Sequence, residues 1–279
     1  ARSLGRSKAL ISKSIGDLEQ RLGARLLNRT TRQIGLTEIG SAYLQRAREL
    51  VAEFDALEDA VRSNSTTPRG RLRLTAPQAF GELELMGLIC GFRAKNPDVE
   101  PDIFLSDRVV DLVGEGFDVA LRVTSMPDST LIARKLCDVP MRICAAPSYL
   151  ARAGTPVSPA DLADHACIVD TNLSTRDVWR FKSNTRNGFD SVKVGSVLAI
   201  NSALAVRQAA LSGVGIAACP DFTVARDLAS GALLELFPEA TDYDLALHIV
   251  YPHRLHLSAK ARAFIDFTTQ WYTKGKLNG

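Results

Sequence analysis

The residues of this chain best suited to chemistry are short polar and cationic side chains near its start. Lys8, Ser12 and Lys13 fall within one predicted helix, and Arg29 and Arg32 follow in a predicted basic hairpin. Hydroxyl, ammonium and guanidinium groups placed in this way can reach the base edges and the phosphates of DNA. The chemistry that the sequence indicates first is therefore recognition of a polyanion.

The charge distribution favours the same interpretation. Residues 1–36 hold eight Lys or Arg and two acidic residues, so 8 − 2 gives +6, whereas the whole chain carries +3 and the remainder therefore −3. A cationic N-terminal segment, followed by a mildly anionic chain, indicates that a polyanion binds at the N-terminal segment alone. A solvated basic surface without a partner is the alternative.

A turn followed by an amphipathic helix positions these side chains. Gly5 suits a turn that needs positive φ, and Ser7 is a good N-cap for the helix that follows. Gly16 lies inside this helix, where it costs about 0.5–1 kcal/mol relative to Ala. Apolar residues recur at spacings of three and four and are expected to face the core of the domain: Leu10, Ile11, Ile15, Leu18 and Leu22.

The stretch from Ala1 to Gly40 resembles the DNA-binding domain of LysR-type transcriptional regulators. The pattern is carried by Leu4, Gly5, Ser7, Ser12, Ile15, Leu18, Glu19, Leu22, Gly23, Leu26, Leu27, Arg29, Thr30, Arg32, Leu36, Thr37 and Gly40. Arg6 departs from it, because the family has an apolar residue there. The resemblance implies a winged helix-turn-helix over residues 1–36 that is truncated, its first helix missing, because the family begins about 20 residues earlier on ordinary helix lengths.

The resemblance also implies which residues contact DNA. The helix would read base edges in the major groove, and the wing would touch phosphate or the minor groove. The expected contacts are Ser7, Lys8, Ala9, Ser12 and Lys13 on the helix, and Arg29, Thr30, Thr31 and Arg32 in the wing.

Residues 37–65 carry one long helical pattern that begins at a plausible N-cap, Thr37. Its apolar stripe requires a partner, either its own domain or a second copy of the chain. The resemblance favours the second copy, because this family uses the segment as a linker and dimerisation helix. A dimer also suits operator DNA, since two half-sites require two DNA-binding domains. Residues 63–70 then have the composition of a linker.

From Arg71 onward strands alternate with helices, which predicts an α/β fold with largely parallel sheets. Residues 69–276 also resemble the family's effector-binding domain, which has two lobes like type 2 periplasmic binding proteins. The resemblance is close over Ser106 to Val123, Asp128 to Leu136 and Asn201 to Val224. It implies a lobe one of residues 71–138 plus 249–276 and a lobe two of residues 139–248.

In such sheets a ligand lies at the carboxyl ends of the strands, near helix N-termini. The resemblance implies that two turns between a strand and a helix, one in each lobe, face each other across the expected effector site. The end of another strand would form the third side of this site. The expected effector-binding residues are Pro77, Gln78, Arg122, Thr124, Ser125, Asn201 and Ser202. Taken singly, each of these residues could instead cap a helix or form a turn, and Arg122 could pair with Asp118 or another acid.

Support for catalysis or a metal is weak. The five cysteines are Cys90, Cys137, Cys144, Cys167 and Cys219, without a C-x-x-C pair, so we expect reduced, buried thiols; a redox-sensing thiol is the alternative. His253-x-x-His256 lacks further ligands at zinc spacing and is expected in a loop. No cofactor motif occurs, and no apolar run approaches the roughly 18 residues of a membrane span.

The sequence therefore predicts a cytoplasmic transcriptional regulator resembling the LysR type, with no cofactor and no catalytic residues. Its expected partners are double-stranded operator DNA, a small-molecule effector and itself, as a homodimer or homotetramer. A ligand-binding module without DNA-binding activity is the second hypothesis, and an enzyme that uses the site between the lobes is the third.

Overall fold

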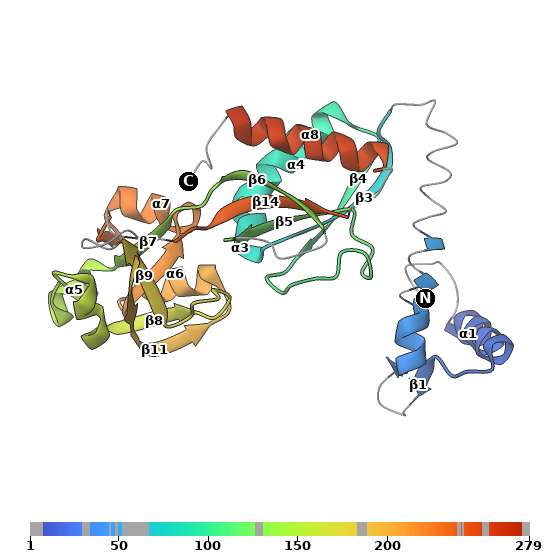
Figure 1. Ribbon diagram of the computed structural model, residues 1–279, viewed down its shortest axis with the longest axis horizontal. Coiled ribbons are helices and arrows are strands. Elements are labelled where there is room, and N and C mark those ends of the chain that lie inside the picture. The colour runs from blue at the N-terminus through green and yellow to red at the C-terminus, as the bar shows by residue number, and fades with distance from the viewer. Residues whose placement is uncertain are drawn as a thin grey trace. The chain divides into compact units, whose positions relative to one another are not determined.

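The computed structural model describes residues 8–29, 34–44, 46–47, 50–51, 67–125, 131–182, 189–238, 241, 243–252 and 257–274. The chain divides into two compact units. The first comprises residues 1–62 with 113–116, and the second comprises residues 63–112 and 117–279. Figure 1 labels many of the elements of both units.

The first unit contains the predicted helix and hairpin. Helix α1 (Lys8–Leu22) is followed by strand β1 (Leu27–Arg29) and strand β2 (Ile34–Leu36), which pair antiparallel. A further helix then includes residues 38–44, 46–47 and 50–51. The Thr37 hydroxyl accepts a hydrogen bond from the N–H of Gly40 at 2.8 Å, so the predicted N-cap of this helix is confirmed.

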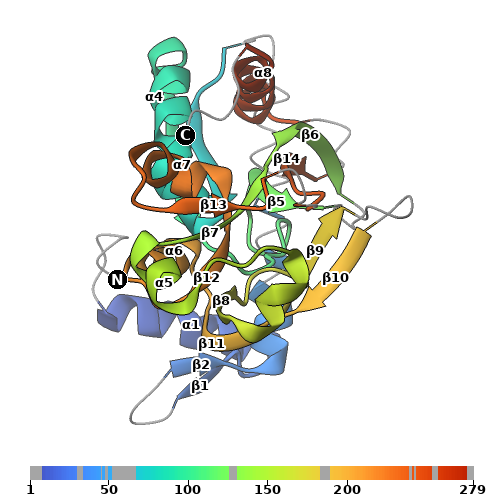
Figure 2. The same cartoon turned by 90° about the vertical axis from the view of Figure 1, so that its left-hand side faces the viewer.

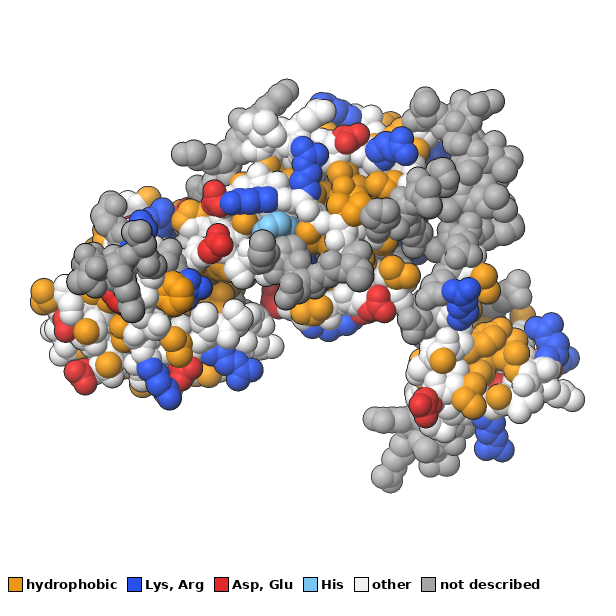
Figure 3. Space-filling view, viewed as in Figure 1, with side chains coloured by type: hydrophobic (Ala, Val, Ile, Leu, Met, Phe, Trp, Pro, Cys, Tyr) orange, Lys and Arg blue, Asp and Glu red, His pale blue; other side chains and the backbone are white. Residues whose placement is uncertain are grey.

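The apolar face of α1 is more exposed than its spacing predicts. Leu10 and Leu22 keep 45% and 44% of their surface exposed, and Leu26 is the one buried apolar side chain among the described residues of this unit. Figure 3 shows apolar side chains gathered on the visible face of the unit. The expectation that Leu10 and Leu22 face a core is wrong for the described part of the chain, because no described element packs over them.

In the second unit, lobe one is built on a five-stranded sheet of order β4-β3-β5-β14-β6. Its strands are β3 (Gly70–Ala76), β4 (Val99–Leu105), β5 (Val119–Thr124), β6 (Ile132–Asp138) and β14 (Ala246–Tyr251). A continuous helical stretch follows β3, namely α3 (Gln78–Phe80), the π-helical turn η2 (Gly81–Leu85) and α4 (Met86–Lys95). Helix α4 and the last helix, α8 (Ala259–Lys274), lie together on one face of this sheet (Figure 1).

Lobe two has its own five-stranded sheet, of order β11-β8-β12-β7-β13. Its strands are β7 (Met141–Ala145), β8 (Ala166–Asp170), β11 (Gly195–Ile200), β12 (Ile216–Pro220) and β13 (Leu234–Leu236). Strands β9 (Val178–Lys182) and β10 (Phe189–Lys193) form a hairpin beside this sheet (Figure 2). The helices of this lobe are α5 (Pro147–Ala153), the 3₁₀ helix η3 (Pro159–Asp164), α6 (Ala203–Leu211) and α7 (Asp221–Ser230).

Both sheets are mixed, so the expectation of largely parallel sheets is wrong. Strand β3 runs parallel to β4 and β5, and β8 runs parallel to β11 and β12. Strand β14 is antiparallel to β5 and β6, and β7 is antiparallel to β12 and β13. The antiparallel pairs arise because β6 leads out of lobe one into β7 and β14 leads back.

The return into lobe one also begins earlier than expected. Strand β14 starts at Ala246 and pairs through His248 with Arg122 and Lys135. Residues 246–248, which the sequence placed in lobe two, therefore belong to the sheet of lobe one.

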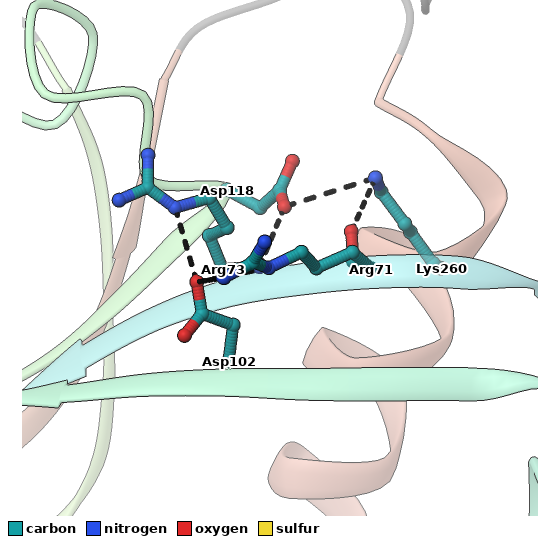
Figure 4. A network of polar contacts seen from close by, with 5 residues as sticks. All are labelled: Arg71, Arg73, Asp102, Asp118 and Lys260. Atoms are coloured by element: carbon teal, nitrogen blue, oxygen red, sulfur yellow. Dashed lines mark hydrogen bonds and ion pairs between the residues drawn. The ribbon is translucent and has the colours of Figure 1, made fainter. Parts of the chain in front are cut away.

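Five charged residues connect the start of β3 to its neighbours (Figure 4). The Asp102 carboxylate on β4 pairs with Arg71 at 2.8 Å and with Arg73 at 3.3 Å. The Asp118 carboxylate accepts from the main-chain N–H of Arg73 at 2.8 Å, and Lys260 of α8 donates to the carbonyl of Arg71 at 2.6 Å. These contacts hold the first strand of lobe one to β4 and to the last helix.

The helical layer of lobe one packs through fully buried aromatic rings. Phe92 of α4 and Phe264 of α8 meet edge to face, with 5.2 Å between ring centroids. Aromatic pairs of this geometry add to the free energy gained by burying the rings. This contact fixes α4 against α8 over the sheet.

We expect Phe92→Ala to lower the free energy of unfolding of the second unit by about 3–5 kcal/mol, because it leaves a cavity between α4 and α8. Val109→Ala is the control, since Val109 is 95% exposed, and it should change that free energy by less than about 0.5 kcal/mol. Urea unfolding measures both variants, and equal losses would contradict this assignment of the core.

Candidate functional site

The first unit presents the predicted polar side chains on α1. Ser12 and Lys13 are both exposed, as predicted for residues that reach DNA. Lys8 and Ala9 lie in α1 and Arg29 ends β1, but their side chains fall outside the described residues. Ser7, Thr30, Thr31 and Arg32 lie wholly outside them.

A carboxylate of α1 fixes the hairpin to the helix. Glu19 Oε1 accepts hydrogen bonds from the main-chain N–H groups of Leu26 and Leu27, at 2.7 Å and 3.0 Å. Charge-assisted bonds of this kind are stronger than neutral ones. The Glu19 carboxylate therefore positions the first residues of β1 relative to the exposed surface of α1.

Gly40 allows the helix that begins at residue 38 to pack close to the main chain of Leu26, just before β1. A Cβ atom at residue 40 would lie 2.0 Å from the carbonyl oxygen of Leu26. Thr37 contacts the same segment, since its N–H donates to the Leu26 carbonyl and its hydroxyl donates to the Arg25 carbonyl. Side-chain and main-chain bonds thus hold α1, the hairpin and the helix that begins at residue 38 together.

In the second unit, the strand ends of lobe one gather several of the predicted effector residues. Pro77 and Gln78 follow β3, and Thr124 and Ser125 lie at the end of β5, which is parallel to β3. The N–H of Gln78 donates to Asp107 Oδ1 at 3.1 Å, and its side-chain amide donates to Glu82 at 3.2 Å. The Asp107 carboxylate therefore accepts from the first N–H of the helix that follows β3.

Arg122 binds within lobe one. Its Nη1 donates to the Ser106 carbonyl at 3.1 Å, and its Nη2 donates to the Thr75 hydroxyl at 3.3 Å. These bonds join the ends of β3, β4 and β5. The Asp118 carboxylate accepts from the main-chain N–H of Arg73, and its pairing with Arg122 stays a prediction.

The strand ends of lobe two hold the remaining predicted residues. Asn201 is exposed after β11, and the Ser202 hydroxyl caps α6 by accepting from the N–H of Ala205 at 3.3 Å. Asp170 ends the neighbouring strand β8 and is only 6% exposed. Its Oδ1 accepts from the N–H of Asn172 at 2.9 Å.

Contacts between the lobes bring these two sets of strand ends together. Phe80 of α3 meets Phe222 of α7 edge to face, with 6.0 Å between ring centroids, and Leu204 of α6 packs against the core of lobe one. The pKa of the Asp170 carboxyl is raised, mainly by burial and in part by the Asp107 carboxylate of lobe one. We call the strand ends at residues 75–78, 106–107 and 122–125 of lobe one, with residues 170–172 and 201–202 of lobe two, the interlobe site.

The sequence prediction missed Ser106, Asp107 and Asp170. A signal for them was present, because each acid comes at or just after the end of an apolar strand, in the stretches Ile103 to Asp107 and Cys167 to Asp170. Polar residues in that position of a parallel strand lie where ligands bind in α/β sheets.

Most of the cysteine side chains are buried, as small apolar residues are. Cys144, Cys167 and Cys219 are buried, and burial raises the pKa of the Cys167 thiol to about 12. Cys90 is exposed, so the expectation of burial is wrong for this residue. His253 and His256 lie outside the described residues.

Within the described ranges, no group of three or more His, Cys, Asp or Glu is arranged to hold a metal ion. Among the same residues, no helix is long and apolar enough to cross a membrane.

Two protein families match the chain. Residues 65–273 match the LysR substrate binding domain, and residues 1–41 match the bacterial regulatory helix-turn-helix protein family, lysR type. Together these matches cover both units.

Similar proteins agree with these matches. The transcriptional regulator PtxR of Pseudomonas aeruginosa is 36% identical over 95% of this chain and 85% of its own length. The structure of CrgA, a LysR-type regulator from Neisseria meningitidis, has a TM-score of 0.66 at 31% identity and covers 98% of this chain and 92% of that one. The full-length structure of AphB, a virulence activator of Vibrio cholerae, has a TM-score of 0.70 at 26% identity, over 96% and 91% of the two chains.

Gly40→Ala is expected to destabilise the first unit by about 1–3 kcal/mol, because the added Cβ overlaps the Leu26 carbonyl. Gly16→Ala is the matched control: no atom lies within 4 Å of its added Cβ, and it should stabilise α1 by about 0.5–1 kcal/mol. Amide hydrogen exchange of peptides from residues 8–44 reports both changes, with peptides from the second unit as the internal reference. Unchanged exchange in Gly40→Ala would refute the proposed packing.

Proposed function

Since this chain belongs to the LysR family of DNA-binding transcriptional regulators, we propose that α1 and the β1–β2 hairpin bind its operator. The observation that carries this proposal is the exposed pair Ser12 and Lys13 on a helix whose family match is the regulatory helix-turn-helix. Helix side chains of this kind read base edges, while Arg29, Thr30, Thr31 and Arg32 of the wing bind phosphate or the minor groove. Ser7, Lys8 and Ala9 complete the proposed helix contacts.

A small-molecule effector at the interlobe site regulates this binding in our proposal. The match to the LysR substrate binding domain supports a ligand there, and the strand ends of both lobes supply the polar groups. The proposed effector contacts are Pro77, Gln78, Thr124 and Ser125 of lobe one and Asn201 of lobe two. An effector that binds one arrangement of the lobes more tightly shifts the population, and a coupling of about 1–3 kcal/mol changes operator affinity measurably.

We further propose that the regulator acts in the cytoplasm as a homodimer or homotetramer, without enzymatic activity. Ile39, Tyr43 and Leu50 are exposed on the helix that Thr37 caps, at spacings of four and seven residues. Such a stripe suits pairing with the same helix of a second copy. Two copies related by a two-fold axis match two half-sites of operator DNA.

The DNA proposal is tested by fluorescence anisotropy with the intergenic DNA beside the gene, at several salt concentrations. The double variant Arg29→Ala, Arg32→Ala should bind more weakly, and the slope of log affinity against log salt should fall by about one for each phosphate contact removed. Lys182→Ala, an exposed cation of the second unit, is the control and should bind like the wild type. Binding that is insensitive to the double variant would refute a role for the wing.

The effector proposal is tested with any small molecule that shifts the operator affinity of the wild type. Gln78→Ala and Asn201→Ala should reduce this shift, because both side chains lie at the interlobe site, and should leave affinity without effector unchanged. Equal loss of basal affinity and of response would instead indicate a general structural defect.

A further inference from the structure

One aromatic side chain of lobe two belongs to the apolar core of lobe one. Among the described residues, Phe222 of α7 is the one buried side chain from a helix of lobe two that lies in this core. Its ring meets the ring of Phe80 of α3 edge to face, at an interplanar angle of 89°. Phe80 is fully buried and Phe222 is only 8% exposed. This contact joins the lobes in addition to the two places where the chain crosses between them.

Hydrogen bonds fix the position of Phe222 on lobe two. The N–H of the preceding residue, Asp221, donates to the Pro140 carbonyl at 2.8 Å, where the chain passes from β6 to β7. The Asp221 carboxylate accepts from Arg142 Nε at 2.6 Å, and Arg142 Nη1 donates to Glu235 at 3.0 Å. Such charge-assisted bonds are stronger than neutral ones. The start of α7, and the Phe222 ring with it, is therefore held on lobe two.

The partner ring is fixed on lobe one, beside the interlobe site. Phe80 ends α3, which begins at Gln78. The N–H of Gly81 donates to the Pro77 carbonyl at 2.8 Å and closes this helical turn. A Cβ atom at Gly81 would overlap the side chain of Leu105, so the turn packs directly on the end of β4. Phe80 and Gln78 consequently keep one position relative to the sheet of lobe one.

A rotation of one lobe against the other must separate the two rings, because each ring is fixed on its own lobe. Separation would expose apolar surface that the core of lobe one buries, and the hydrophobic effect opposes this exposure. Packed interfaces of this kind change between discrete arrangements and do not deform continuously. The contact between Phe80 and Phe222 therefore favours one arrangement of the lobes.

We propose that Phe222 is a latch: its contact with Phe80 holds the lobes in the arrangement of the structure and limits how often a second arrangement forms. This inference rests on the proposed function, because it names a regulatory contact of the interlobe site. Gln78 shares one helical turn with Phe80, so the latch also positions the lobe-one side of that site relative to lobe two. Phe222 acts through Phe80 and is a positioning residue.

Pulsed electron–electron double resonance between spin labels on the two lobes tests the latch. One label is attached to Cys90 of α4, which is exposed, and the other to Ala151→Cys, an exposed position of α5. Cys137 is replaced by Ser, and the other three cysteines are buried. An excess of unlabelled chain suppresses distances between copies.

The wild type should give one narrow distance distribution. Phe222→Ala should raise the population at a second distance about tenfold or more, because the buried ring contact is lost. Phe80→Ala should raise the same population, and the double variant should add little, since both substitutions remove one contact. An unchanged distribution in Phe222→Ala would overturn the proposal.

Phe181→Ala is the matched control. Phe181 is 1% exposed and meets Phe237 edge to face at 6.0 Å, the same geometry as the latch but within lobe two. It should lower the stability of lobe two and leave the distance between the lobes as in the wild type; a second distance in this control would also overturn the latch. Phe222→Leu keeps most of the apolar volume and should show a smaller increase, and this variant decides the question if Phe222→Ala does not fold.

Operator binding by the same variants, without any small molecule, keeps the latch distinct from the proposed function. If the arrangement of the lobes controls DNA binding, Phe222→Ala should change operator affinity and Phe181→Ala should not. A second distance with unchanged operator affinity would establish the latch and refute the proposed coupling to DNA. Operator binding by the wild type with no second distance in Phe222→Ala would leave the regulator in place and refute only the latch.

Discussion

Strand β14 lies between β5 and β6, and its backbone groups are paired on both sides. Ile249 is opposite Leu121 on β5 and opposite Arg134 on β6. Because a buried strand cannot leave its N–H and C=O groups unpaired, this position ties the C-terminal part of the chain, from Ala246, to the strands of lobe one. The sheet of lobe one, its contact with α8 and the connection to lobe two all depend on this pairing. Two antiparallel strands, β6 and β14, are consequently the strands through which the chain leaves lobe one and returns to it.

Strand β3 runs from the charged contacts at one end of lobe one to the interlobe site at the other end. Its start is held by Arg71, Arg73 and Lys260 to carboxylates and carbonyls of neighbouring elements, and its end leads into the interlobe site at Pro77. These anchors and the packing of the sheet restrict movement of β3 relative to β4 and α8. The exposed ion pairs of this network contribute little stability individually, and their effect is positional.

Local patterns predicted the elements well. The helix at α1 and the Thr37 cap each depend on neighbours within a few residues, and the structure has both. The antiparallel place of β14 was not predictable in this way, because it depends on partners more than 100 residues away in sequence. The same holds for Asp107, whose bond to Gln78 spans two strands, and for Asp170, whose burial needs the assembled lobes. The sequence indicates that Asp107 and Asp170 lie at strand ends. Which hydrogen-bond donors their carboxylates contact depends on the tertiary structure.

The chain order of the lobes has a consequence for synthesis. Lobe two is continuous from Met141 to Leu236, whereas the sheet and core of lobe one are completed by Leu247, Ile249 and Phe264. A nascent chain emerging from the ribosome therefore presents all of lobe two while β5 still lacks its neighbour β14. Domains fold as units once their residues have emerged, and an unpaired strand edge is prone to aggregation in the meantime. Lobe one, although first in sequence, is therefore the half whose residues are complete last, and the edge of β5 stays without β14 until then.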